Sequence, residues 1–312
     1  MVRDNHINYD PAEILISCGA KHSLYNACQV LFQTGDEVII FSPYWVSFPD
    51  FIAVTGAKPV FVKTVPQRQF EPDFEDLKAK ITSNTRGIII NSPSNPTGGV
   101  WEDDAILRVL KIAQNINAWI LSDECYEQLT YDRPYISTAA LSKNYEKVLT
   151  FQSCSKTYAM TGWRIGYTAG NQDVIKAMSK LQGQSTSCPN SIAQVAAIEA
   201  LTGDQTEVKY MRAEFKKRRD YIVDRLNSID DVICATPGGA FYVFPDFSAH
   251  MVKDGKIKCS DDLSMYLLEE HSVVTVSGAA FGGEGHIRFS YAASDDDLRL
   301  AMNIVEKALK EI

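Results

Sequence analysis

Short apolar runs, many of them rich in β-branched residues, alternate with longer segments of helical period over the first two-thirds of the chain. This alternation predicts βαβ units and therefore an α/β domain with a parallel sheet. The apolar residues within each run are consecutive, which indicates strands that are covered on both faces. Strands are predicted at residues 37–41, 59–63, 87–91, 119–122, 148–153 and 164–169, and covering helices at 105–114 and 174–182.

The pattern changes after residue 202. A long charged helix is predicted at 205–226, followed by two strands at 232–236 and 240–245 and then by helix, strand, strand and helix. We therefore expect an α/β domain over residues 1–202 and a smaller α+β domain over 203–312. The basic run 216–219 is interpreted as a solvated helix face, because an apolar stripe accompanies it. The stripe consists of Val208, Met211, Phe215, Ile222 and Leu226.

The composition excludes several classes of protein. With 45% hydrophobic and 22% charged residues the chain is of the folded, soluble type, and its net charge of -8 argues against nucleic acid or an anionic membrane surface as a partner. The seven cysteines form no C-x-x-C pair, so neither a disulfide framework nor a metal site is indicated. There is no apolar signal core and no run of about 18 apolar residues, so we expect a cytoplasmic protein without a membrane span.

Common catalytic motifs are absent from the sequence. It contains no H-E-x-x-H, no G-x-S-x-G and no P-loop. The glycine-rich segment FGGEGH (281–286) does not follow a predicted strand and open a helix, so it is weak support for a dinucleotide site. Any catalytic site of this chain must therefore consist of another arrangement of polar residues.

Polar residues gather where strands of the first domain are predicted to end. Gly19, Ala20 and Lys21 stand between an apolar run and a helix, where free backbone N–H groups suit a phosphate or simply begin the helix. The turn NSPSNPTG (91–98) projects the amide of Asn95 above the sheet. Because ligands of a parallel sheet bind at the carboxyl ends of its strands, we expect these groups to lie together.

Two further segments add charged groups to the same edge. LSDECYE (121–127) ends a strand with Asp123 and Tyr126, and a carboxylate in that position should meet a cation. SCSKTYAMTGWRIGY (153–167) supplies hydroxyls and a guanidinium, which suit a phosphate, and an amine, which suits an aldehyde. These are Ser153, Ser155, Arg164 and Lys156.

Together and in this order, the segments resemble the class I aminotransferases of the fold-type I pyridoxal-phosphate family. The likeness runs from about Pro11 to the end, and it is closest to the bacterial aspartate aminotransferases. It also includes GDEVIIFSPYWVSFPD (35–50), AMTGWRIGYTAG (159–170), GGAFYVFPDFS (238–248) and GHIRFSYAASDDDL (285–298). The resemblance implies a mostly parallel, seven-stranded sheet sandwiched by helices, with a smaller α+β C-terminal domain.

The resemblance also implies roles for individual residues. Lys156 would be the catalytic residue, linked to the aldehyde of pyridoxal 5'-phosphate as an imine and then acting as a general base. Asp123 would keep the pyridine nitrogen protonated, and Tyr126 and Asn95 would hydrogen-bond the ring oxygen. The remaining cofactor residues are Gly19, Ala20, Ser153, Ser155 and Arg164 around the phosphate, Trp45 stacked on the ring, and Lys21.

Substrate binding is assigned by the same resemblance to Trp45, Asn95 and Arg288, and Arg288 would take the α-carboxylate of an amino acid or 2-oxo acid. Lys21 resembles a lysine that binds the second carboxylate in some members, although a surface residue at the start of a helix fits equally. The segment 183–191 resembles one that reaches the cofactor of the neighbouring subunit, so a homodimer with shared active sites is expected.

Three alternatives stay open at this stage. The first is an aminotransferase of other specificity, such as aromatic, prephenate or alanine, and the second is a carbon–sulfur lyase that uses the same cofactor. The third is a binding module without activity, either the sensor half of a transcription regulator or a truncated relic. The relic is considered because family members usually carry a further N-terminal segment before the position of Asn8, with a helix, a substrate-binding glycine and a tyrosine that reaches the partner's phosphate.

Overall fold

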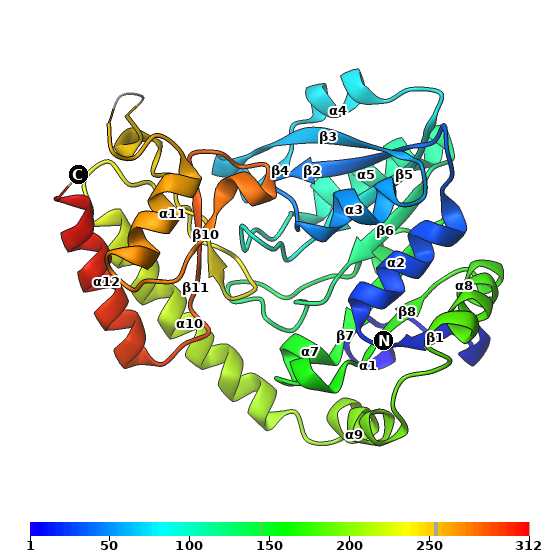
Figure 1. Ribbon diagram of the computed structural model, residues 1–312. Helices are drawn as coiled ribbons and strands as arrows, with labels where there is room; N and C mark the ends of the chain where they lie inside the picture. The colour runs from blue at the N-terminus through cyan, green and yellow to red at the C-terminus, as the bar shows by residue number, and fades with distance from the viewer. Residues whose placement is uncertain (144, 253–254, 312) are drawn as a thin grey trace.

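The computed structural model describes residues 1–143, 145–252 and 255–311. A large mixed sheet flanked by helices fills one part of the molecule, and a smaller three-stranded sheet with its own helices lies beside it (Figure 1). The α/β fold that the sequence predicts is therefore confirmed. Within the described residues, none of the helices is both long and apolar enough to cross a membrane.

The large sheet has the strand order β1-β8-β7-β6-β5-β2-β3-β4. Its centre is parallel, from β7 through β6, β5 and β2 to β3, whereas β1, β8 and β4 run antiparallel to their neighbours. We predicted seven strands, and the eighth is the two-residue edge strand β4. The strands are β1 (Ile14–Ser17), β2 (Glu37–Ser42), β3 (Lys58–Val65), β4 (Glu71–Pro72), β5 (Thr85–Asn91), β6 (Trp119–Asp123), β7 (Val148–Ser153) and β8 (Gly166–Ala169).

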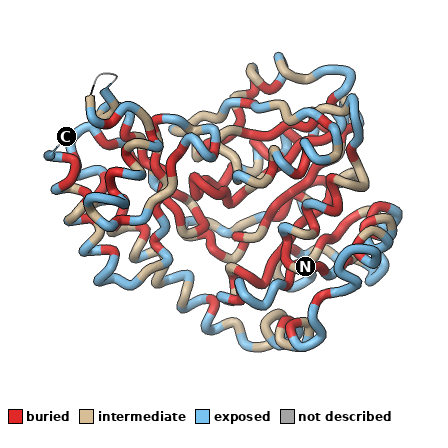
Figure 2. The backbone as a smooth tube through the Cα atoms, viewed as in Figure 1, coloured by how far each residue is buried: buried red, intermediate tan, exposed pale blue. Residues whose placement is uncertain are grey.

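Successive residues of the central strands enter two different hydrophobic cores, as the period of a strand requires. In β2, for example, Val38 and Ile40 pack in one core, and Ile39 and Phe41 pack in the other. Figure 2 shows the buried backbone of these strands running through the middle of the region. The first core is covered by α2 (Ala20–Leu31), α3 (Ser47–Ala53) and α8 (Gln172–Ser185), and the second by α4 (Phe74–Lys80), α5 (Asp103–Ile116) and α6 (Thr138–Leu141).

The C-terminal part has a hydrophobic core of its own, which includes Ile222, Phe247 and Tyr291. Its sheet has the order β10-β11-β9. The predicted succession of helix, strand, strand and helix at the end of the chain is present. The elements are α10 (Thr206–Asn227), β9 (Tyr242–Val243), α11 (Ser260–Glu269), β10 (Val276–Ser277), β11 (Ile287–Ser290) and α12 (Asp295–Leu309). The domain boundary at residues 202–203 stays a prediction.

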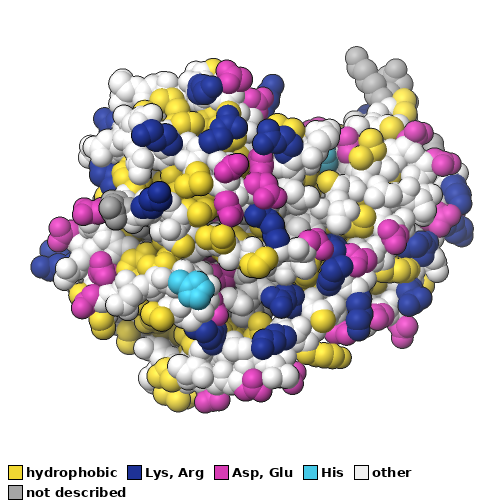
Figure 3. Space-filling model, turned by 180° about the vertical axis from the view of Figure 1, so that it is seen from behind, with side chains coloured by type: hydrophobic (Ala, Val, Ile, Leu, Met, Phe, Trp, Pro, Cys, Tyr) yellow, Lys and Arg dark blue, Asp and Glu magenta, His cyan; other side chains and the backbone are white. Residues whose placement is uncertain are grey.

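The remaining elements are short, apart from α9. They are α1 (Val2–Asn5), α7 (Cys154–Thr157) and α9 (Ser191–Thr202), with single turns of 3-10 helix at η1 (Pro11–Glu13), η2 (Pro66–Arg68), η3 (Thr161–Trp163), η4 (Ser248–His250) and η5 (Gly278–Phe281). On the face shown in Figure 3, basic and acidic side chains are interspersed, with hydrophobic side chains among them.

Three of the predicted strands are wrong in extent or in kind. The strand predicted at 240–245 is reduced to the two residues of β9. Arg164 is not part of a strand, because it adopts a left-handed conformation after η3 and β8 begins only at Gly166. Residues 232–236 contribute only the isolated bridge of Ile233 to Asp246. The side chain of Asn227 accepts from the backbone N–H of Cys234 and donates to its carbonyl, at 2.8 and 3.0 Å, so these groups need no neighbouring strand.

The basic run of α10 is the predicted solvated face only in part: the Lys217 side chain is 72% exposed, but Arg219 is buried. The side chain of Arg219 is only 3% exposed and makes a bidentate ion pair with Asp132. Its guanidinium carbon lies 5.0 Å from the ring centroid of Tyr131 and it donates to the carbonyl of Pro237. The run therefore contains an ion pair between a buried arginine of α10 and an exposed aspartate of the loop after β6, which periodicity cannot reveal.

Candidate active site

A cavity of about 440 Å³ lies beyond the carboxyl ends of β5, β6 and β7. Asn91, Asp123 and Ser153, which end these three neighbouring strands, all line it. This is the position in which open α/β sheets bind ligands, and the volume is in the usual range for such sites. The structure brings all of the predicted site residues into the lining except Gly19 and Arg288, which contact the lining residues Arg164 and Asn95 respectively.

One end of the cavity is built for an anion. Gly19 is the N-cap residue of α2 with a φ of 88°, and a Cβ atom there would lie 2.5 Å from Nη2 of Arg164. Glycine thus lets the start of the helix approach the guanidinium closely. Arg164 donates to the carbonyls of Thr161 and Cys18 at 2.9 and 3.3 Å, and no carboxylate of the described residues pairs with it. Its charge, the helix start and the hydroxyls of Ser153 and Ser155 converge on one place.

Asp123 lies at the floor of the cavity and is 6% exposed. One carboxylate oxygen accepts from the backbone N–H of Cys125 at 3.2 Å. Burial raises the pKa of Asp123, and the thiol and backbone N–H of Cys125 and the charge of Lys156 only partly oppose this. No Lys, Arg or His of the described chain forms an ion pair with the carboxylate. A cation supplied by a ligand would therefore be stabilised at this position.

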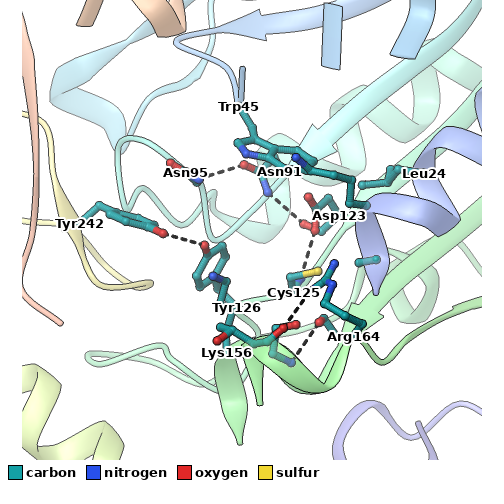
Figure 4. A pocket seen from close by; sticks show the side chains of 15 residues that line it. Leu24, Trp45, Asn91, Asn95, Asp123, Cys125, Tyr126, Lys156, Arg164 and Tyr242 are labelled. Atoms are coloured by element: carbon teal, nitrogen blue, oxygen red, sulfur yellow. Dashed lines mark hydrogen bonds between the residues drawn. The ribbon is translucent and has the colours of Figure 1, made fainter. Parts of the chain in front are cut away.

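Lys156 belongs to the short helix α7 that follows β7, and its amine points into the cavity (Figure 4). Nζ lies 5.5 Å from the ring centroid of Phe241 and 6.0 Å from that of Tyr126. Burial lowers the pKa of Lys156, and Arg164 and Arg288 lower it further, against the opposing effect of Cys125 and Asp123. A lysine with a lowered pKa is more often neutral, as a nucleophile or a base must be.

The turn after β5 forms another part of the wall through Asn95, and Arg288 of β11 contacts this turn. Arg288 donates through Nη1 to Oδ1 of Asn95 at 2.9 Å, and its guanidinium lies between the rings of Tyr242 and Phe281. Its Nε atom is buried and has no partner within the described residues. Gly98 permits the contact of this turn with the C-terminal part, because a Cβ atom there would lie 2.7 Å from the carbonyl oxygen of Tyr242.

Trp45 and Lys21 complete the rim. Trp45 packs edge-on against Phe48 and Phe51, which hold its ring beside the cavity. Nζ of Lys21 lies 5.0 Å from the centre of the Trp45 ring. Lys21 is exposed and has no carboxylate partner among the described residues, so it is a cation that a ligand can reach.

Four polar lining residues were not predicted from the sequence: Asn91, Cys125, Thr161 and Tyr242. Asn91 accepts from the backbone N–H of Asn95 at 3.0 Å and donates to the carbonyl of Asp123 at 3.3 Å, so it links the ends of β5 and β6. The rule that selected Asp123, a polar residue that ends a strand, would have selected Asn91 as well. Tyr242 lies in the quoted segment GGAFYVFPDFS, but nothing in that segment indicates where its side chain points.

Comparison with known proteins places this cavity in a family. The sequence profile of the family described as "Aminotransferase class I and II" matches residues 1–304. The chain belongs to this family. The protein is therefore an aminotransferase of a family that uses pyridoxal phosphate, with amino acids and 2-oxo acids as substrates, and the predicted family and enzyme class are confirmed.

Individual proteins of similar sequence or structure are also aminotransferases. Aspartate aminotransferase of Geobacillus stearothermophilus is 42% identical over 310 residues, covering 99% of this chain and 79% of that protein. Aspartate/prephenate aminotransferase of Cereibacter sphaeroides is 44% identical over 306 residues, covering 96% and 76%. Aspartate aminotransferase from Thermus thermophilus with maleate superimposes with a TM-score of 0.92 at 36% identity, covering 98% of this chain and 78% of that one. The enzyme from Rhizobium meliloti gives a TM-score of 0.94 at 39% identity, covering 99% and 79%.

Proposed function

We propose that this aminotransferase transfers the amino group of L-aspartate to 2-oxoglutarate, giving oxaloacetate and L-glutamate in a ping-pong reaction. The observation that carries the proposal is a pair of cations at the cavity, Arg288 and Lys21, neither of which has a carboxylate partner within the described residues. Each suits one carboxylate of a dicarboxylic substrate. Relatives of similar sequence are named aspartate aminotransferase.

The cavity fits pyridoxal 5'-phosphate as the cofactor. The anion end formed by Gly19, Ala20 and Arg164 with Ser153 and Ser155 suits the phosphate, and the buried carboxylate of Asp123 suits a protonated ring nitrogen. Trp45 offers a flat face beside this position. When bound, this cofactor supplies an aldehyde that links covalently to amines and a ring that accepts electrons.

With the cofactor bound, individual residues of the chain would have separate roles in catalysis and substrate binding. Lys156 would supply the amine that links to the cofactor. Once that amine is free again, it would act as a base that moves a proton to and from the substrate carbon, and its lowered pKa favours this role. Tyr126 and Asn95 supply an O–H and an N–H group to the ring oxygen. Arg288 orients the α-carboxylate through two parallel N–H groups, including the unpartnered Nε.

We further propose that the protein is a homodimer with shared active sites. Ile192, Val195 and Ile198 lie along one side of α9 and are 72%, 67% and 61% exposed. An apolar stripe of this kind on a helix favours a protein partner. The exposed residues 183–188 precede this helix, and the resemblance expects the segment 183–191 to reach the partner's cofactor.

A second candidate keeps the donor and changes the acceptor. The relative from Cereibacter sphaeroides, 44% identical, is named aspartate/prephenate aminotransferase. Prephenate also carries two carboxylates, so the same pair of cations would serve it. We therefore expect the selectivity between 2-oxoglutarate and prephenate to depend on the size of the cavity near Lys21 and not on the charge of Lys21.

The test is the absorption spectrum of the protein loaded with pyridoxal phosphate, with single amino acids added in turn. L-aspartate and L-glutamate should change the visible band, and 2-oxoglutarate or prephenate should restore it. Lys156→Ala is the matched control and should show no such cycle. A response to L-phenylalanine or L-alanine but not to L-aspartate would contradict the proposed specificity. Release of sulfide from L-cysteine would indicate a lyase, and no response to any amino acid would indicate a relic.

A further inference from the structure

Tyr242 connects two parts of the active site that are far apart in the chain. It lies in β9 opposite Ser290 of β11. Arg288 precedes Ser290 by two positions, so Tyr242 and Arg288 share one face of the small sheet as diagonal neighbours. The hydroxyl of Tyr242 lies 3.1 Å from that of Tyr126, which follows β6 of the large sheet. Tyr242 is therefore in contact with both the arginine and the tyrosine of the site.

The ring of Tyr242 determines where the guanidinium of Arg288 lies. The guanidinium carbon is 4.7 Å from the Tyr242 ring and 4.9 Å from the Phe281 ring, so the cation is held between two aromatic rings. Tyr242 is only 7% exposed, and a cation–π contact is strongest where water is excluded. These contacts use none of its N–H groups as donors to a carboxylate, and Nε has no partner within the described residues, so it stays available for a carboxylate.

The hydroxyl of Tyr242, in contrast, acts on Tyr126 through a hydrogen bond. Tyr126 has a single O–H group, and in the proposed function that group is donated to the cofactor. Tyr126 must then accept from Tyr242, so the Tyr242 hydroxyl is the donor of the 3.1 Å hydrogen bond. A hydroxyl that accepts a hydrogen bond becomes a stronger donor itself. The Tyr242 hydroxyl would thus strengthen the bond from Tyr126 to the ring oxygen and favour the anionic form of that oxygen.

We propose that Tyr242 is a positioning residue with two separable roles: its ring orients Arg288 toward the substrate carboxylate, and its hydroxyl acts on the cofactor through Tyr126. This inference rests on the proposed function, because it needs a carboxylate at Arg288 and a ring oxygen at Tyr126. The two roles are separable since Tyr242→Phe removes only the hydroxyl, whereas Tyr242→Leu removes the ring as well.

Two measurements on the protein loaded with pyridoxal phosphate test the inference. One is the dissociation constant of maleate, an unreactive dicarboxylate, and the other is the pH midpoint at which the visible absorption band changes. Tyr242→Phe should leave maleate binding within about twofold and raise the pH midpoint by about 0.5 unit or more. Tyr242→Leu should raise the midpoint similarly and weaken maleate about tenfold. Tyr210→Phe, at a tyrosine that is 61% exposed on α10, is the control and should change neither quantity.

The outcomes are distinguishable. Equal weakening of maleate by Tyr242→Phe and Tyr242→Leu would overturn the role of the ring, and an unchanged midpoint in Tyr242→Phe would overturn the role of the hydroxyl. If the unmodified protein shows neither a visible band nor maleate binding, the proposed function itself fails, and the inference fails with it. Circular dichroism establishes that each variant is folded, and Tyr242→Met replaces the Leu variant if that one is not.

Discussion

Glu124 is a buried acid next to the floor of the active site, and its neutralisation should change how the stability of the protein depends on pH. The side chain is fully buried, and its Oε1 atom accepts from the Ser122 hydroxyl at 2.8 Å and from the Thr138 N–H at 2.9 Å. Burial, together with the charge of Glu127, raises the pKa of Glu124 to about 8. The folded protein therefore holds a proton on Glu124 at neutral pH that the unfolded chain releases.

The sign and size of the effect follow from this difference. A group whose pKa is raised on folding contributes a stability that falls as the pH rises from its unfolded value, 4.5, toward about 8. The loss is about 1.4 kcal/mol per pH unit within that window. Between pH 5.5 and 7.5, Glu124 should therefore lower the free energy of unfolding by about 2.5 kcal/mol. Glu124→Gln resembles the protonated acid in shape and cannot titrate, so this loss should disappear in the variant.

Urea denaturation of both proteins at pH 5.5, 6.5 and 7.5 measures the effect. The variant should match the unmodified protein near pH 5.5 and become more stable than it as the pH rises, whether or not Glu127 also titrates. Glu75→Gln is the matched control, because the Glu75 side chain is 83% exposed, and it should leave the pH profile unchanged. Parallel pH profiles for Glu124→Gln and the unmodified protein would refute the reasoning.

Three further changes test the active site and the dimer. Lys156→Ala should abolish the link to pyridoxal phosphate that borohydride reduction traps, with the fold intact by circular dichroism, and a link retained in that variant would contradict the assignment. Arg288→Leu should weaken 2-oxoglutarate and maleate by about 3 kcal/mol, the scale of losing one partner of a buried charge pair. Cofactor affinity, measured by fluorescence titration, should stay unchanged, and an equal loss there would mean that Arg288 is misplaced. Ile192→Asp combined with Val195→Asp should convert the proposed dimer to a monomer in sedimentation, because both side chains are exposed on α9; an unchanged mass would place the interface elsewhere.

Most of the large sheet and one side of the site could be predicted from the sequence. The central strands are buried on both faces, so each is a continuous apolar run whose end is marked by a polar residue, as at Asp123 and Ser153. Parallel strands bring these ends to one edge without further information. The errors lie where a side chain replaces the expected backbone pairing, as Asn227 does at Cys234, or where a left-handed residue delays a strand, as at Arg164.

The sequence by itself thus determined the fold class, the family and the residues at the ends of neighbouring strands, because these depend on local periodicity and on motifs that are continuous in the chain. Only the tertiary structure decided that Arg288 lies between two aromatic rings, that Tyr242 bonds to Tyr126, and that Arg219 is buried against Asp132. Each of these contacts joins residues that are far apart in the chain. Their geometry depends on strand register and on how the C-terminal part packs against the large sheet, which no local pattern of hydrophobic and polar residues records.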